Sequence, residues 1–220
     1  MRNKFNVLFA FLLVVIFISF CATISLSQVT DKDGNTYKTV TIGTQEWTAE
    51  NLKVEHYRNG DVIPQVQDKE QWKKLTTGAW CYYESSTENG TTYGKLYNWY
   101  AVNDSRGLAP EGWHIPSDAE WTTLIEFLGG SKDAGEKIKS TELWKDIKWA
   151  TNESGFSAIP GGLCDENYNY KFIGKHACFW SSTSNNTVAS WIREMHNNLK
   201  DVKRDTFHKR YGLSVRCIKD

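Results

Sequence analysis

The clearest pattern of apolar and polar positions lies between Gly107 and Gly130. Apolar residues recur at positions 121, 124, 125 and 128, which is the spacing of one helical face. Ser117 is a typical N-cap residue, and Glu120 follows it at the spacing of a capping box. Gly129 is a typical helix stop. The pattern predicts a helix that begins after Ser117 and buries Trp121.

Elsewhere the pattern predicts short elements. Asp33-Gly34 indicates a hairpin turn, and Asp68 to Leu75 a short helix. Ser85 to Thr92 is polar and contains Asn-Gly, which favours a loop. Tyr93 to Val102 has helical spacing and is expected to cover the first helix. Strands are predicted at Ala79 to Tyr83, Gly155 to Ile159, Phe179 to Thr183, Val188 to Met195 and Tyr211 to Ile218.

The first 27 residues have the pattern of a signal peptide. Arg2 and Lys4 precede an apolar run, and small residues at Ser25 and Ser27 suit cleavage before Gln28. The prediction is an exported protein with one domain over residues 28–220, located in the periplasm, on the cell surface or outside the cell. Lipidation of Cys21 and a retained anchor are the alternatives, although the apolar run is shorter than the ~20 residues that a spanning helix needs.

Charge and composition limit the classes of partner that the protein is expected to bind. The chain has 26 basic and 26 acidic residues, and loss of Arg2 and Lys4 with the leader leaves a slight acidic excess. This balance argues against a nucleic acid or an anionic membrane as partner. The 10 Trp and 10 Tyr residues suit a loop-rich domain or a binding surface, because aromatic side chains carry a large apolar face and a polar group.

Four cysteines follow the leader, and an even number in an exported chain predicts two disulfides. Three pairings are possible. We favour Cys164 with Cys178, which closes a short loop, and Cys81 with Cys217, which ties the end of the chain to its first half. The alternative is a metal site formed by Cys164, His176 and Cys178, although zinc fingers use tighter paired spacings.

Six blocks of sequence resemble the Fibrobacter succinogenes major paralogous domain family, in the family's order and over nearly the whole mature chain. The resemblance implies an exported bacterial domain of lipoproteins or surface proteins, and no known activity. The blocks are TVTIGTQEWTAENLK, YGKLYNWYAVND, RGLAPEGWHIPSDAEW, NESGFSAIPGG, FWSST and YGLSVRCIKD.

The HIPSDAEW block, followed by a helix and by a late G-x-S-V-R strand, is similar to the formylglycine-generating (sulfatase-modifying) enzymes. That resemblance implies an α+β protein of C-type-lectin-like fold, with two main helices on small, irregular antiparallel sheets and with long loops. Those enzymes use a cysteine pair near the C-terminus, which no motif here reproduces. The calcium-dependent sugar motifs of true C-type lectins are also absent.

The sequence lacks the motifs of metalloproteases, serine hydrolases and phosphate-binding loops. We therefore expect no catalytic residue, metal or cofactor. The expected function is a non-enzymatic binding module for an extracellular glycan or protein. A surface structural component is the alternative, followed by an oxidoreductase of formylglycine-generating type.

The predicted ligand site is a polar loop pinned by the expected Cys164–Cys178 bridge, with help from two residues that share a strand face. The tyrosine rings of this loop are expected to pack on a sugar ring or on a protein partner. Its acidic and amide groups are expected to form hydrogen bonds with the ligand. A solvated hairpin that only covers its own disulfide is the alternative. The site residues are Asp165, Asn167, Tyr168, Asn169, Tyr170, Trp191 and Arg193.

Overall fold

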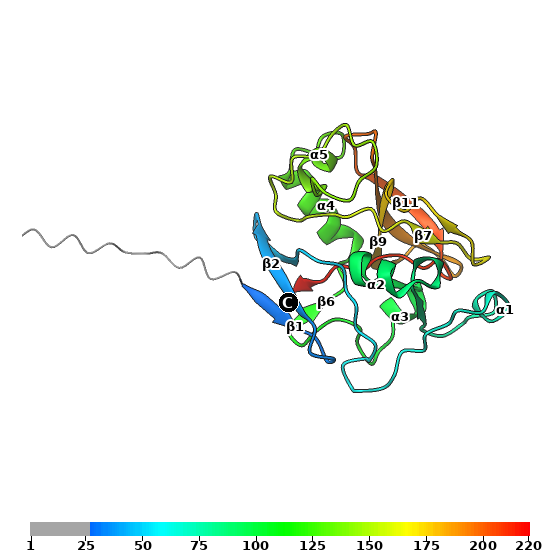
Figure 1. Cartoon of the computed structure of the whole chain (residues 1–220). Coiled ribbons are helices and arrows are strands. Elements are labelled where there is room, and N and C mark those ends of the chain that lie inside the picture. The colour runs from blue at the N-terminus through cyan, green and yellow to red at the C-terminus, as the bar shows by residue number, and fades with distance from the viewer. Residues whose placement is uncertain (1–26) are drawn as a thin grey trace, which may run out of the picture.

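The structure is a computed structural model that describes residues 27–220 (Figure 1). The predicted leader, apart from Ser27, lies outside the described residues. Within the described part, no helix is both long enough and apolar enough to cross a membrane. The fold combines small antiparallel sheets, short helices and long loops, so the prediction of an α+β protein is confirmed at that level.

The largest sheet joins the two ends of the described chain. Its five strands, in spatial order, are β1 (Gln28–Thr30), β2 (Thr36–Ile42), β3 (Gln45–Thr48), β12 (Ile218–Lys219) and β6 (Trp113–His114). The predicted hairpin at Asp33-Gly34 is confirmed as the β1–β2 turn. Glu46 binds both ends of the described chain, because it accepts hydrogen bonds from Ser27 Oγ (3.0 Å) and Lys219 Nζ (2.8 Å).

A second sheet has the order β11 (Lys203–His208), β10 (Ala189–His196) and β9 (His176–Ser184), all antiparallel. The strands predicted at 179–183 and 188–195 are confirmed, and β11 was missed. The strand predicted at Tyr211 to Ile218 is mostly wrong. That segment is buried from Gly212 to Ile218, and it bridges residues of three different strands before it pairs as β12.

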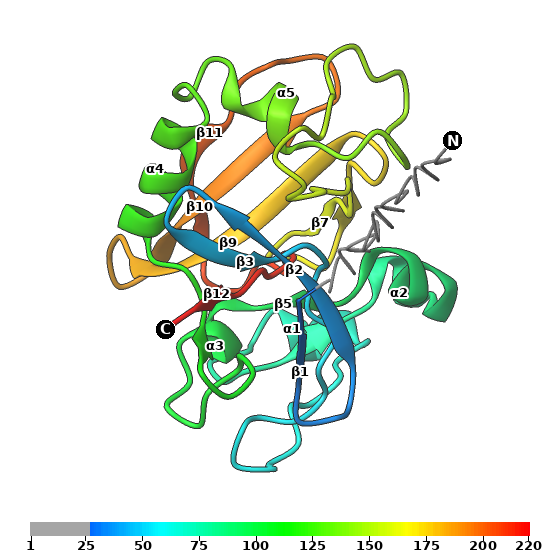
Figure 2. The same cartoon turned by 90° about the vertical axis from the view of Figure 1, so that its left-hand side faces the viewer.

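Helix α4 (Asp118–Phe127) confirms the predicted helix. Ser117 Oγ accepts a hydrogen bond from the Glu120 amide at 3.2 Å, and the Ser117 amide donates one to the Glu120 carboxylate at 2.7 Å. The helix lies beside the β9–β10–β11 sheet (Figure 2). Trp121 is completely buried there, in the core cluster that also contains Trp47, Phe156 and Phe179.

Two predictions on the chain from Ser85 to Val102 are wrong. The expected loop contains α2 (Thr87–Tyr93), in which Gly90 packs on the Tyr82 ring and leaves no room for a side chain. The expected helix is interrupted, because Gly94 adopts a left-handed conformation and β5 (Leu96–Tyr97) pairs with β4 (Trp80–Cys81). Only α3 (Trp99–Val102) remains helical, with Asn98 as its cap.

The other elements are short. The predicted helix near Asp68 is confirmed as α1 (Lys69–Trp72), capped by the Asp68 carboxylate, and the strand predicted at 79–83 is confirmed as β4. The segment predicted as a strand at 155–159 forms only one bridge, from Ala158 to Lys139. The rest are a 3₁₀ turn η1 (Tyr83–Ser85), α5 (Ala134–Ile138), β7 (Leu163–Cys164) and β8 (Tyr170–Lys171).

Candidate functional site

The loop predicted to bind ligand is largely occupied with its own contacts. The Asp165 carboxylate is buried and accepts hydrogen bonds from the backbone amides of Asn167 and Asn169, each at 2.9 Å. Its second oxygen lies 2.8 Å from Lys171 Nζ. Burial raises the pKa of Asp165, but these hydrogen bonds outweigh it and the pKa is lowered. Asp165 therefore shapes the turn.

The two tyrosines of this loop pack on the body of the protein. Tyr168 contacts Trp72 at 5.6 Å between ring centroids, and Tyr170 contacts Tyr83 at 5.2 Å. Both hydroxyl groups approach Ser85 Oγ, at 3.2 and 3.4 Å. Both tyrosine rings are partly buried by this packing, although Asn167 and Asn169 stay exposed. Ligand binding by this loop stays a prediction.

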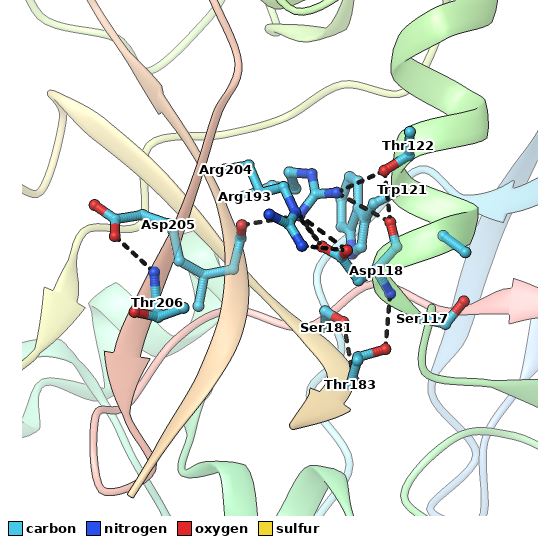
Figure 3. A network of polar contacts seen from close by, with 12 residues as sticks. Ser117, Asp118, Trp121, Thr122, Ser181, Thr183, Arg193, Arg204, Asp205 and Thr206 are labelled. Atoms are coloured by element: carbon cyan, nitrogen blue, oxygen red, sulfur yellow. Dashed lines mark hydrogen bonds and ion pairs between the residues drawn. The ribbon is translucent and has the colours of Figure 1, made fainter. Parts of the chain in front are cut away.

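Trp191 and Arg193 lie elsewhere, against α4 and β11. Arg193 is 1% exposed and donates to the Asp118 carboxylate at 2.7 Å and to Thr122 Oγ1 at 3.1 Å (Figure 3). Arg204 binds the same carboxylate and lies 3.4 Å from the centre of the Trp191 ring. The predicted alternation on one strand face is right. That face is occupied by protein contacts, so the two residues do not join the loop in one site.

Neither predicted disulfide is present, and the four cysteines of the described residues are free and buried. The positions of the cysteines in the core explain why. Cys81 and Cys164 belong to one hydrophobic cluster, together with Trp72, whereas Cys178 and Cys217 belong to another. Each expected bridge would have to join the two clusters. The alternative metal set is brought together only in part, because His176 lies close to Cys178 whereas Cys164 belongs to the other cluster.

A different metal-type group surrounds Cys178. His176 Nδ1 lies 2.8 Å from Glu194 Oε1, and Cys178 Sγ lies 3.7 Å from the same oxygen. The ligand atoms of these three residues are all within 4.8 Å of one another. Burial raises the pKa of Glu194, but the close contacts of its carboxylate with His176 and His196 outweigh burial and hold the pKa well below its usual range. Sequence reasoning missed Glu194 and His196.

His114 links the C-terminus to the start of α4. Its Nδ1 lies 2.7 Å from Asp220 Oδ1, and its Nε2 lies 2.8 Å from Glu120 Oε1. Ser117 Oγ donates to Glu120 rather than to His114. This is not the serine–histidine pair of a nucleophilic catalyst, in which the imidazole accepts the hydroxyl proton.

We expect His114 to make stability depend on pH. Burial lowers its pKa, but the hydrogen bonds and charges of Asp220 and Glu120 outweigh burial, so the pKa is raised above 6.5. The stabilisation is then complete below about pH 6.5 and is lost as the pH rises through the raised value. Urea denaturation of the wild type and of His114→Gln should differ more at pH 6 than at pH 9. An equal difference at both values would contradict this assignment.

The structure also contains a polar cleft of about 420 Å³ that the sequence did not predict. It lies where the chain after β3, the end of α2, the loop after α5 and the segment before β7 meet. Five of its side chains are charged, and most of the others carry an amide or a hydroxyl group. Its lining includes Lys38, Glu50, Asn51, Lys53, Thr91, Tyr93, Ser140, Thr141, Glu142, Leu143, Asn152, Ser157 and Arg216.

Arg216 carries a buried positive charge at this cleft. The side chain is fully buried and donates to Asn51 Oδ1 (2.8 Å) and to the carbonyl oxygens of Thr48 (2.9 Å), Phe156 (2.7 Å) and Ser157 (2.8 Å). All four acceptors are neutral, and within residues 27–220 Arg216 forms no ion pair. Burial lowers its pKa to about 9, against the opposing effect of Glu50. Its charge is therefore uncompensated at close range.

Strained backbone gathers at the same cleft. Leu143, Asn152 and Ser157 have φ values of 70°, 53° and 57°, in the left-handed region that non-glycine residues rarely adopt. Asn152 and Ser157 hold each other, because the Ser157 amide donates to Asn152 Oδ1 and Asn152 Nδ2 donates to Ser157 Oγ, both at 2.9 Å. Such strain persists where the surroundings enforce it and is common at binding sites.

Comparisons with known proteins identify the family of this chain. No curated protein and no solved structure matches the chain. The sequence matches the Fibrobacter succinogenes major domain over residues 40–219. Four of the six blocks noted above supply residues to the cleft, among them Asn51, Tyr93, Asn152 and Arg216. The chain belongs to the Fibrobacter succinogenes major domain family.

Proposed function

We propose that the protein is an exported binding module that holds a hydroxyl-rich ligand, an oligosaccharide, in the cleft above Arg216. The observation that carries this proposal is the composition of the cleft. Amide, hydroxyl and charged groups line it, and Tyr93 contributes an aromatic ring. Protein sites for small ligands typically combine an aromatic or apolar surface with a few well-placed polar groups.

Tyr93 is suited to contact a sugar ring. It is half-buried, burial raises its pKa, and it lies at the end of α2. Its backbone carbonyl accepts a hydrogen bond from Asn51 Nδ2 at 2.8 Å, so the chain that carries the ring is fixed to the floor of the cleft. Aromatic side chains bind with little loss of conformational freedom, and a fixed backbone reduces that loss further.

Arg216 gives the cleft a preference for polar or negatively charged ligands. The buried guanidinium has neutral partners, while Lys38 and Lys53 add positive charge at the rim and Glu50 and Glu142 add negative charge. Potentials inside a cleft with low-dielectric walls act more strongly than on an open surface. We therefore expect oligosaccharides with carboxylate groups to bind at least as well as neutral ones.

The test is a glycan array followed by calorimetric titration of the best oligosaccharide. We expect Tyr93→Ala to weaken binding about tenfold or more, which is about 1.4 kcal/mol. Tyr170→Ala is the matched control, because Tyr170 is also a half-buried tyrosine but lies at the end of the loop at 165–170, outside the cleft. The affinity of folded Tyr170→Ala for the oligosaccharide should equal that of the wild type.

Three outcomes oppose the proposal. Loss of affinity in Tyr170→Ala alone would place the site in the loop at 165–170. Binding of no glycan, together with capture of a protein partner that Tyr93→Ala does not affect, would favour a protein-binding module with another site. Binding of neither, with the protein ordered on the cell surface, would favour a structural component.

We infer a C-type-lectin-like arrangement, supported by a sheet that pairs both ends of the described chain and by one main helix beside a second small sheet. The likeness to formylglycine-generating enzymes stays a prediction.

Cleavage near Ser27, tested by mass spectrometry of the mature N-terminus, would place the protein outside the cytoplasm. A lipid on Cys21 would instead mark a lipoprotein.

A further inference from the structure

Four side chains of the types that can bind a metal ion form a square on one face of the β9–β10 pair. His176 and Cys178 occupy alternate positions of β9, and Glu194 and His196 occupy alternate positions of β10. His176 is directly opposite His196, and Cys178 is directly opposite Glu194. Because alternate residues of a strand point to the same face, all four side chains project together.

The contacts within this square converge on the Glu194 carboxylate. His176 Nδ1 contacts Oε1, and His196 Nε2 lies 3.1 Å from Oε2. The His196 contact is out of line for a hydrogen bond, so its buried Nε2 has no hydrogen-bond partner among the described residues. The His176 and His196 rings stack at 3.9 Å between centroids, with Phe172 stacked on His176 at 4.2 Å.

We propose that His176, Cys178 and Glu194 bind a divalent ion of Zn²⁺ type, with His196 as the fourth ligand. Zn²⁺ accepts sulfur, imidazole nitrogen and carboxylate oxygen in a tetrahedral arrangement. The thiol and the imidazoles select against Ca²⁺ and Mg²⁺, which prefer oxygen ligands. Because Nε2 of His196 has no hydrogen-bond partner among the described residues, this atom would lose no hydrogen bond on binding the ion.

The position of the cluster suits a site that an ion can reach. Cys178 is fully buried, whereas the side chains of His176 and His196 are 17% and 16% exposed, so the cluster lies close to the surface. Phe172 covers the outer side of the His176 ring from a strained backbone with φ of 68°. The stacked rings hold both imidazoles beside the Glu194 carboxylate, and groups that pack around metal ligands in this way help to orient them.

Binding of the ion would replace the thiol proton. Burial and the neighbouring Glu194 carboxylate raise the pKa of the Cys178 thiol, and a bound divalent cation reverses that electrostatic preference. The thiol releases one proton to solvent as the thiolate–metal bond forms, with no change of oxidation state. Metal affinity should therefore rise with pH.

The test is titration of the purified, chelator-treated protein with Zn²⁺ and with Co²⁺ as a spectroscopic probe. We expect one ion per chain, a thiolate-to-Co²⁺ charge-transfer absorption, and a higher melting temperature with Zn²⁺ but not with Ca²⁺ or Mg²⁺. Cys178→Ser should remove the charge-transfer absorption. Glu194→Gln and His196→Ala should each weaken Zn²⁺ binding about tenfold or more.

Cys217→Ser is the matched control, because Cys217 is equally buried but lies outside the square. It should keep both the absorption and the affinity. If Cys178→Ser fails to fold, the Co²⁺ spectrum of the wild type still decides, since the absorption requires a thiolate ligand. Absence of stoichiometric binding, or a Co²⁺ complex without that absorption, would overturn the proposal and leave an ion-pair network of purely structural role.

Discussion

Replacing Trp121 by alanine is expected to lower the free energy of unfolding by about 3–5 kcal/mol. The Trp121 ring lies 4.9 Å from that of Trp47 and 5.7 Å from those of Phe156 and Phe179, measured between centroids. Its Nε1 donates to the carbonyl of Trp180 at 3.3 Å. Removal of the ring would therefore leave a large cavity where α4 meets both large sheets.

Phe127→Ala is the matched control for Trp121→Ala. Phe127 is an aromatic residue on the same helix, but it is 64% exposed. Its replacement should change stability by less than about 1 kcal/mol. Urea denaturation followed by tryptophan fluorescence and by circular dichroism measures both variants. Equal stability of wild type and Trp121→Ala would mean that the central helix does not hold the two sheets together.

Arg216→Met is expected to destabilise the protein by roughly 3 kcal/mol or more. Methionine fills a similar volume but leaves Asn51 Oδ1 and three backbone carbonyls without a donor, and a buried polar group that loses its partner costs about 1–3 kcal/mol. The guanidinium also lies 4.6 Å from the Phe156 ring, a cation–π contact that methionine does not make.

Arg204→Met separates the effect of burial from the effect of charge. Arg204 also makes several hydrogen bonds, to Asp118, but its side chain is 47% exposed. Exposed ion pairs contribute about 1 kcal/mol or less, so this variant should stay close to the wild type. A destabilisation of Arg204→Met as large as that of Arg216→Met would show that burial at the cleft is not what makes Arg216 important.

Local signals explain what the sequence predicted well. Ser117 and Glu120 specify the start of α4 by hydrogen bonds within four residues, and Asp33-Gly34 specifies the first hairpin in the same way. The helix expected at 93–102 failed because its spacing is helical, whereas Leu96 and Tyr97 are held extended by β4. Long-range pairing outweighed the local pattern there.

The candidate sites depend on long-range contacts. The cleft brings together Asn51, Tyr93, Asn152 and Arg216, which no local motif connects. The predicted cysteine pairing is wrong because an even number of cysteines does not indicate which hydrophobic cluster each cysteine joins. The square on β9 and β10 did leave a signal, since His-x-Cys and Glu-x-His alternate on neighbouring strands. The predicted strand began at position 179, however, and so excluded His176 and Cys178.

Chemical-shift mapping can locate the ligand relative to the cleft above Arg216. ¹⁵N-labelled protein is titrated with the oligosaccharide that binds best on the array. We expect the largest amide shifts at residues 91–94, 140–143 and 152–157, around the cleft, with little change at 165–170. Shifts centred on 165–170, with the cleft unaffected, would contradict binding in the cleft.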